Sequence, residues 1–415
     1  MYYNKRPKRV RRLGFGLSRE LWIVEVGIFL NMLGYGAVLP FEVIYLHEGR
    51  GFSLGVAGLV VGTVTGLAVV AAPVAGTVID RVGARATAVG AGMALAAGYG
   101  GLAFAQTPRQ AFIAAAVAGA GNGALVPSQS ALVASLASPE LLHRASAVSR
   151  VAANVGIGLG GALGGLVAAY GLHGFVVLFL ANALTYVLYV AILAVAVHED
   201  ARPTPVAGGY RLLIRDRPFV RLALTNIAMI AVGWGVFTWI VPPYARGEIG
   251  LGPRRIGLLA LANAFTVVLA QIPVARLAEG RRRVVAMAIA SVAFAGACLL
   301  VAGAGLVGSP YAYAALFAAV ITVAVGECFH TTALMPLVAD LAPVALRGRY
   351  MATIGLSWWL GLALAPTLGT QLLSVSPPAA LLAAAGAALA AGLSALALER
   401  DLPAAIRLTP RPAGR

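Results

Sequence analysis

Residues 54–85 read LGVAGLVVGTVTGLAVVAAPVAGTVIDRVGAR, and no charged side chain interrupts the stretch before Asp80. A helix needs roughly 20 apolar residues to cross the hydrocarbon core of a bilayer. Residues 54–79 therefore predict a membrane-spanning helix, and the charges that follow predict a loop at one membrane surface. The strands of an outer-membrane barrel would instead alternate apolar and polar side chains.

Apolar runs of this length recur along the chain and predict twelve spanning helices. The expected spans are 21–46, 54–79, 85–106, 110–137, 145–170, 172–197, 218–245, 254–278, 284–306, 310–338, 349–374 and 377–398. The first run follows a basic N-terminus but is too long for a signal peptide, so we expect it to be retained. The chain is thus predicted to be an all-α integral membrane protein.

Composition supports this fold class. Hydrophobic residues make up 60% of the 415 residues and charged residues 11%, whereas a soluble domain carries roughly 25% charge. The formal charge of +16 lies in basic clusters between apolar runs, which favours membrane lipids over nucleic acid as the partner. Cys298 and Cys328 lack metal-ligand spacing, and no Walker or Rossmann motif is present in the required context. We therefore expect no cofactor, no metal and no enzymatic activity.

The positive-inside rule gives the orientation. With the N-terminus in the cytoplasm, five of the 31 basic residues lie in outer loops, namely Arg50, Arg109, Arg246, Arg254 and Arg255. The sequence therefore predicts a multi-pass protein of the plasma (inner) membrane with both termini cytoplasmic.

The chain divides into two similar halves. Ala72-Pro73-Val74-Ala75 corresponds to Ile272-Pro273-Val274-Ala275, and a basic loop follows each of these segments. Such repeats favour two bundles with a site between them near the membrane midplane. The expected divisions are a cytoplasmic tail (1–20), a six-helix bundle (21–197), a cytoplasmic linker (198–217), a second six-helix bundle (218–398) and a second tail (399–415).

Residues 76–85, Gly-Thr-Val-Ile-Asp-Arg-Val-Gly-Ala-Arg, resemble the loop after the second helix in the major facilitator superfamily, Gly-x-Leu-Ala-Asp-Arg-x-Gly-Arg-Arg. The resemblance implies the twelve-helix major facilitator fold. It also implies a gating role for the matching residues, which are Gly76, Asp80, Arg81, Gly83 and Arg85. In that family the Asp contacts the eleventh helix and holds the cytoplasmic side closed. The alternative is that these charges only fix the topology.

The fifth helix is similar to a Gly-rich motif of the twelve-helix drug:proton antiporters. The matching positions are Gly156, Gly160, Gly164 and Gly165, with Gly161 in place of the motif's proline. Small residues at this spacing permit close helix packing, and the resemblance associates the motif with export. Generic packing in a chain with 50 glycines is the other interpretation.

Ionisable residues within a bilayer are candidates for function. Glu327 lies well inside its predicted span, and apolar surroundings favour the neutral carboxyl, so it is a candidate to bind and release a proton. His330 lies three residues further on nearly the same face and could relay protons with it. Glu42 is a further candidate near the outer end of the first helix.

Polar and aromatic side chains within the spans are candidates to line a substrate cavity. They are Asn31, Tyr35, Asn122, Asn226, Trp234, Asn263, Gln271 and Trp358. Few charges and many aromatics favour an amphipathic small molecule. The resulting hypothesis is a monomeric secondary transporter that exports such molecules in exchange for protons by alternating access. A proton-coupled importer or symporter, and a non-transporting receptor or scaffold, remain the alternatives.

Overall fold

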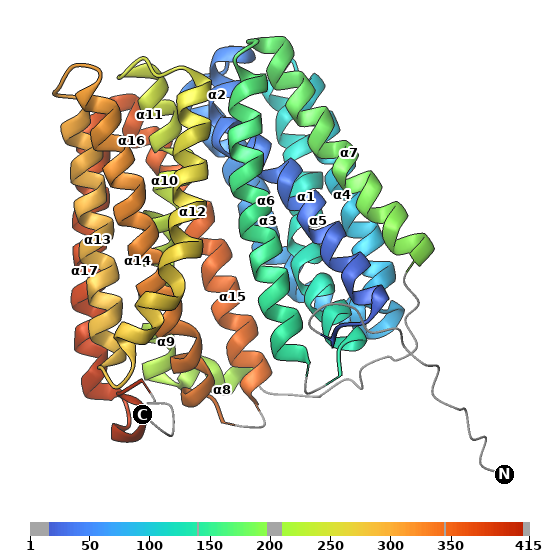
Figure 1. The fold of residues 1–415 in the computed structure, drawn as a ribbon, viewed down its shortest axis with the longest axis vertical. Helices are drawn as coiled ribbons and strands as arrows, with labels where there is room; N and C mark the ends of the chain where they lie inside the picture. Colours follow the sequence, from blue (N-terminus) through green and yellow to red (C-terminus); the bar gives the residue numbers. More distant parts are fainter. Residues whose placement is uncertain (1–15, 139–140, 197–209, 344–345, 410–415) are drawn as a thin grey trace.

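The computed structural model describes residues 16–138, 141–196, 210–343 and 346–409, and it is drawn in Figure 1. Within them, twelve helices are long and apolar enough to cross a membrane. They confirm the twelve predicted spans, and no boundary differs from its prediction by more than three residues.

The described residues form seventeen α-helical segments, and all of them except α8 belong to these spans. They are α1 (Arg19–Val38), α2 (Glu42–Ile44), α3 (Leu54–Val82), α4 (Ala84–Phe104), α5 (Pro108–Leu136), α6 (Leu142–Ala168), α7 (Leu172–Ala196), α8 (Tyr210–Arg215), α9 (Arg217–Ile230), α10 (Val236–Trp239), α11 (Val241–Gly247), α12 (Pro253–Ala278), α13 (Arg283–Ala304), α14 (Tyr311–Leu341), α15 (Arg347–Leu364), α16 (Thr370–Val375) and α17 (Pro377–Leu398). The expected linker at 198–217 lies partly outside the described residues, and its last part contains α8.

Local sequence sets the helix starts. The side chains of Ser18 and Ser53 accept hydrogen bonds from the backbone N–H groups three residues ahead, and Thr107 forms a capping box with Gln110. Prolines stand at the start of α5, α12 and α17, where the missing N–H is not needed. These caps provide acceptors for backbone N–H groups at the helix starts, which lipid could not provide.

Three spans are interrupted where irregular turns replace α-helix. A 3₁₀ turn at Leu39–Phe41 breaks the first span, and π-helical turns at Ala231–Gly235 and Ala365–Gly369 break the seventh and eleventh. Pro40 and Pro366 lie in two of these turns, and proline removes a backbone donor and deforms a helix. Such turns often occur at functional sites.

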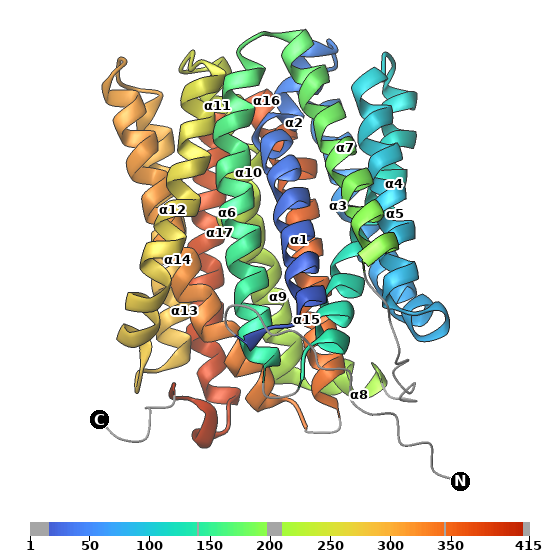
Figure 2. The same ribbon diagram turned by 45° about the vertical axis from the view of Figure 1, so that its right-hand side comes forward.

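The helices form two bundles of six spans, as the repeat predicts (Figure 2). In the first half, α1 packs against α6 and α7, and α4 packs against α5 and α7. In the second half, α13 packs against α14 and α17, and α15 packs against α9. The two halves meet mainly through α6 against α12 and α3 against α15 and α16.

The end of the bundle where α1 begins and α17 ends is called the terminal face, and the opposite end the distal face. The contacts between halves lie toward the distal face. There Gly58 lies against Pro366 and Thr370, and Gly62 against Thr367. A Cβ placed at Gly76, further along α3, would meet open space. The halves are therefore closed at the distal face and separate toward the terminal face (Figure 1).

The loop between α3 and α4 is fastened to its own half. Gly83 adopts a φ of 96° at the turn, a conformation that glycine allows without strain. Arg85 then donates from Nε to the carbonyl of Leu193 at 2.9 Å and from its other nitrogen to the carbonyl of Ala194. A guanidinium at the end of α7 satisfies carbonyls that have no partner within the helix and complements its dipole.

The corresponding loop of the second half is fastened in the same way. Arg283 is almost fully buried at the start of α13 and pairs with Asp340 of α14 at 2.6 Å. The backbone of Gly280 and Arg281 exchanges hydrogen bonds with Thr409. In both halves, the last arginine of the loop thus binds its own bundle.

We predict that Arg85→Ala lowers stability, because the last carbonyls of α7 lose their donors. Hydrogen bonds that involve a charged group contribute about 1.5–3 kcal/mol when removed, so the midpoint of thermal unfolding should fall by several degrees. The measurement is thermal unfolding of the detergent-purified protein. Arg81→Ala is the matched control, because Arg81 is exposed and makes no ion pair among the described residues. Equal effects of the two variants would contradict the anchoring role.

Candidate functional site

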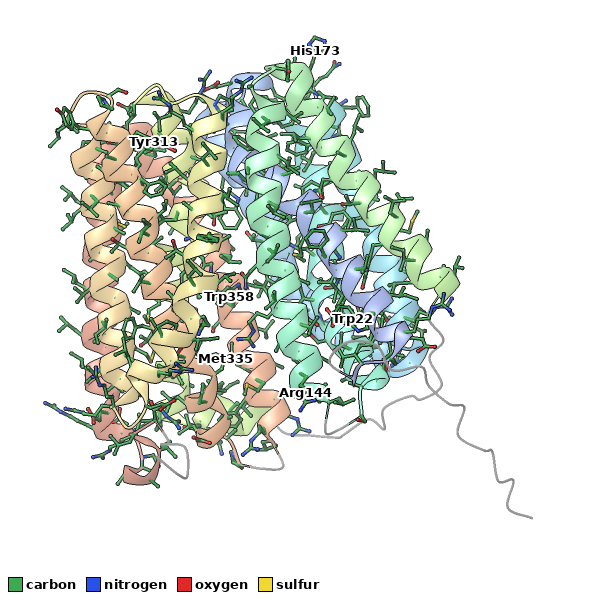
Figure 3. All side chains as sticks on the ribbon, in the orientation of Figure 1. Trp22, Arg144, His173, Tyr313, Met335 and Trp358 are labelled. Carbon is green, nitrogen blue, oxygen red and sulfur yellow. The ribbon has the colours of Figure 1, made fainter. Side chains whose placement is uncertain are left out.

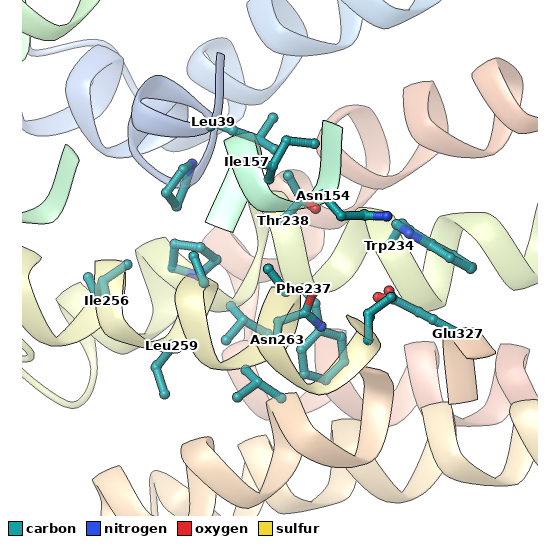
Figure 4. Close-up of a pocket in the computed structure, with 18 of the residues that line it drawn as sticks. Leu39, Asn154, Ile157, Trp234, Phe237, Thr238, Ile256, Leu259, Asn263 and Glu327 are labelled. Carbon is teal, nitrogen blue, oxygen red and sulfur yellow. The ribbon is translucent and has the colours of Figure 1, made fainter. Parts of the chain in front are cut away.

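A cavity lies between the two halves, below the distal contacts. Its volume is about 180 Å³, and its walls come from α1 and α6 on one side and from α10, α11, α12 and α14 on the other (Figure 4). Most of the lining is apolar, including Ile157, Phe237 and Leu259. The cavity therefore joins the halves at the interrupted part of the first and seventh spans.

Among the described residues that line this cavity, Glu327 has the one titratable side chain. It is 7% exposed, and the side chain of Asn263 in α12 points toward its carboxyl (Figure 4). No arginine, lysine or histidine lines the cavity within the described residues. The carboxyl thus lies in a mostly apolar cavity without a counter-charge. In such surroundings, uptake or release of a proton changes the interaction of the carboxyl with its neighbours more than it would in water.

Trp234 separates the cavity from the interior of the second half. It lines the cavity, and its ring contacts Trp358 at 4.7 Å and His330 at 5.4 Å between centroids. His330 is fully buried, and neither ring nitrogen has a hydrogen-bond partner among the described residues. The expected Glu327–His330 pair is therefore not formed in this structure, because Glu327 faces the cavity while His330 packs behind Trp234.

Glu42 connects the two halves just above the cavity. It is 5% exposed, and its carboxylate accepts a hydrogen bond from Tyr99 Oη at 3.0 Å and from Trp239 Nε1 at 2.9 Å. Tyr99 belongs to the same half and Trp239 to the other. Nearer the distal surface, Arg246 pairs with Glu48 at 3.1 Å across the same boundary.

The glycines of α6 make two separate surfaces. A Cβ at Gly156, Gly160 or Gly164 would collide with the backbone or side chains of α1, whereas Gly161 and Gly165 lie against α12. The first surface joins helices of one half, and the second joins the two halves. Close packing of both kinds is what small residues permit.

The other residues of the expected gating loop face the terminal opening. Asp80 is partly exposed, and neither it nor Arg81 makes an ion pair among the described residues. Arg85 binds the carbonyls of Leu193 and Ala194 at the end of α7. The structure therefore holds the loop in a state where the halves are apart at that face.

Two of the eight expected cavity residues line the cavity, namely Trp234 and Asn263. Trp358 lies directly behind Trp234. Asn226 instead donates to Ser357 at 2.7 Å, and Gln271 donates to Thr332 at 3.2 Å. These two amides join neighbouring helices within the second half.

The remaining three expected residues lie in the first half and do not line the cavity. Tyr35 contacts the ring of Tyr99 edge-on at 6.5 Å. Asn31 is fully buried, and its amide has no partner among the described residues. Asn122 is 9% exposed within α5.

Sequence reasoning missed three lining features, namely Asn154, Thr238 and Pro40. Asn154 could have been found, because it lies two residues before the Gly-rich motif of α6. Pro40 and Pro242 occupy corresponding places in the two halves, and both line the cavity. A proline repeated in both halves was thus a usable signal.

Comparisons with known proteins agree with this architecture. The family model of the Major Facilitator Superfamily matches residues 24–240 and 222–415. The chain is 27% identical to multidrug resistance protein MdtH of Aeromonas hydrophila, over 85% of this chain and 86% of that protein. It is 26% identical to the uncharacterised MFS-type transporter YttB of Bacillus subtilis, over 85% and 88%.

Solved structures share the fold at lower identity. A peptide transporter of the POT type superposes with a TM-score of 0.77 at 17% identity, covering 94% of this chain and 96% of that chain. The nucleoside transporter NupG superposes with a TM-score of 0.73 at 12% identity, covering 92% and 100%. With the family model matching both halves, the chain belongs to the major facilitator superfamily of transporters.

Proposed function

We propose that this transporter exports small amphipathic molecules in exchange for protons, by alternating access at the cavity between its halves. The observation that carries the proposal is Glu327, the one titratable side chain among the described residues that line an otherwise mostly apolar cavity. A carboxyl there can hold either a proton or a cationic group of the substrate, and exchange of one for the other couples their movements.

The side chains that line the cavity indicate the class of substrate. Apolar side chains and Trp234 offer surface for an apolar or aromatic body, and Asn154, Thr238 and Asn263 offer hydrogen bonds. Burial of apolar area contributes roughly 25 cal/mol per Å² to the binding free energy, and this contribution does not require one particular ligand shape. The similarity to multidrug resistance protein MdtH supports a substrate of this kind.

The distribution of basic residues supports a cytoplasmic location for the terminal face, and it supports a plasma-membrane protein with both termini inside. The closed distal face and the open terminal face then correspond to the inward-facing state. In the outward-facing state we propose that Asp80 approaches the start of α15 and holds the terminal face closed.

Glu327→Gln should abolish export driven by a proton gradient, because glutamine cannot take up or release the proton. Exchange of external for internal substrate without a gradient should persist, since the fold and the cavity walls are unchanged. The measurement is transport by purified protein in liposomes with an imposed gradient. Asp401→Asn is the control, because Asp401 makes an exposed pair with Arg221 within the second half. Gradient-driven export that survived in Glu327→Gln would remove Glu327 from the coupling step.

Export is distinguished from import in the same liposomes. Substrate should move out of the compartment that corresponds to the cytoplasm as protons move in. Uptake that rises with an inward proton gradient would favour the symporter instead.

Trp239→Phe should favour opening of the distal face, because it removes the hydrogen bond that Glu42 accepts from the other half. A lost hydrogen bond of about 1–2 kcal/mol corresponds to a change of roughly 5- to 30-fold in the ratio of the two states. The measurement is the distance distribution between spin labels at Arg109→Cys and Leu306→Cys, in a background without Cys298 and Cys328.

Tyr99→Phe is the matched control for that experiment. It removes the other hydrogen bond of the same carboxylate, but this bond lies within one half. Its distance distribution should stay close to that of the unmodified protein. A shift of equal size in both variants would mean that Glu42 only stabilises its own bundle.

Asp80→Asn should shift the population toward the state described here, with the terminal face open. The neutral amide interacts less favourably with the positive end of α15, an effect of about 0.3–1 kcal/mol for an exposed carboxylate. The readout is the labelling rate of a cysteine introduced at Val151, on the terminal side of α6. Asp401→Asn is the control, because Asp401 pairs with Arg221 within the second half. An unchanged labelling rate in Asp80→Asn would argue against the gating role.

A further inference from the structure

A second hollow lies in the first half, apart from the cavity of Glu327. It follows the seam between α1 and α6 toward the terminal face, and its volume is about 730 Å³. Trp22 and Arg144 lie at the terminal ends of these two helices (Figure 3). The walls are otherwise apolar, with Phe29 and Val151 among them, and the one further charged residue is Glu25. We call this hollow the α1–α6 groove.

Glu25 is a buried carboxyl, and one of its two oxygens has no hydrogen-bond partner among the described residues. It is 3% exposed. Its Oε1 accepts a hydrogen bond from Ser149 Oγ at 2.6 Å, whereas Oε2 is buried and has no partner among the described residues. A buried carboxylate without a counter-charge is unfavourable. The groove wall therefore contains a group that is stabilised when a cation binds.

We propose that the α1–α6 groove is a binding site for lipophilic cations, with Glu25 as the counter-charge. The proposal rests on the proposed function and names a substrate class and a first binding place on the terminal side. The apolar walls bury the body of such a molecule, and the carboxylate neutralises its charge. Attraction between unlike charges is several-fold stronger in these surroundings than in bulk water.

Arg144 does not neutralise Glu25. The two residues form no ion pair within the part of the chain that the structure describes. Arg144 precedes Ser149, the partner of Glu25, by five residues, about 7.5 Å along a helix, and it is exposed. Water and salt screen an exposed charge at that separation far more than a buried one. The groove thus has a screened positive charge at its rim and an unscreened carboxyl in its wall.

The position of the groove also fits a molecule that arrives from the terminal side. Close contacts between α6 and α12 involve Gly158, Gly161 and Gly165, all nearer the distal face than Val155, the last groove residue of α6. Below that level the halves diverge (Figure 1). Val148, Ala152 and Val155 of the groove lie on a different face of α6 from Asn154 and Ile157, which line the cavity of Glu327. A ligand in the groove thus lies outside that cavity and nearer the terminal face.

The test is equilibrium binding of tetraphenylphosphonium to the purified full-length protein in nanodiscs of zwitterionic lipid, without any gradient. Tetraphenylborate, which has the same size and the opposite charge, is the comparison ligand. We expect the cation to bind more tightly than the anion, and Glu25→Gln to weaken cation binding by at least about tenfold, or 1.4 kcal/mol. Equal binding of the two ions, or unchanged cation binding in Glu25→Gln, would overturn the proposal.

Further variants locate the bound cation. Arg144→Gln should leave cation binding unchanged or tighter, and Val151→Lys should abolish it without altering Glu25. Quenching of tryptophan fluorescence by the ligand should shrink in Trp22→Phe. Ser149→Ala controls for folding, because it removes the hydrogen bond of Glu25 and keeps the charge. Weaker cation binding in Arg144→Gln, or normal binding in Val151→Lys, would contradict the assigned place.

Binding in the cavity of Glu327 is a separate outcome. If the cation binds in that cavity, Glu327→Gln should lose cation binding and Glu25→Gln should retain it. That result would contradict the groove proposal. Because no gradient is applied, these results do not depend on proton coupling. Groove binding that persists in a protein without proton-driven export would defeat the proposed function and leave the groove site intact.

Discussion

The packing of α6 between α1 and α12 is the constraint on which the arrangement of this protein depends. Lipid supplies no hydrophobic force between helices, so association relies on close contact. Glycines give α6 two such surfaces, one toward its own half and one toward the other half. The first keeps the bundle intact, and the second fixes the level at which the halves meet. On the terminal side of that level the two halves are apart in this state (Figure 1).

Three buried glutamates, Glu25, Glu42 and Glu327, occupy different electrostatic settings. Glu42 accepts two hydrogen bonds, one from each half. Glu25 accepts one, from Ser149. Glu327 faces a mostly apolar cavity beside Asn263. A carboxylate that accepts two good hydrogen bonds tolerates burial better than one that accepts fewer. The polar contacts therefore fit Glu42 for holding the halves together, and they fit Glu25 and Glu327 for binding a mobile cation or proton.

The fold was largely predictable because lipid restricts the choices. An apolar run of bilayer length must satisfy its backbone internally, so it must be a helix, and the predicted spans agree with the observed ones within three residues. The loop after the second span identified the family from Gly76, Asp80, Arg81 and Gly83. The irregular turn at Ala231–Gly235 was not predictable, because this segment contains no proline and remains as apolar as a regular span.

The site was predictable only in part, because hydropathy gives the position of a helix but not its rotation. Glu327 and His330 are three residues apart, which places them about 60° apart around the helix axis. That angle is enough to put one side chain in the cavity and the other behind Trp234. The same limit applies to Asn226 and Gln271, which bond neighbouring helices instead of facing the cavity.

The setting of Glu25 was likewise not predictable from the sequence. Near the end of a span, a long acidic side chain is expected to reach toward water. Ser149 of α6 instead draws the carboxyl against the neighbouring helix, and the narrow α1–α6 contact at Gly156 and Gly160 keeps the two helices close enough for that bond. The glycines that join α6 to α1 thus also hold Glu25 beneath an apolar surface, so the packing of these two helices and the electrostatics of the groove have the same structural cause.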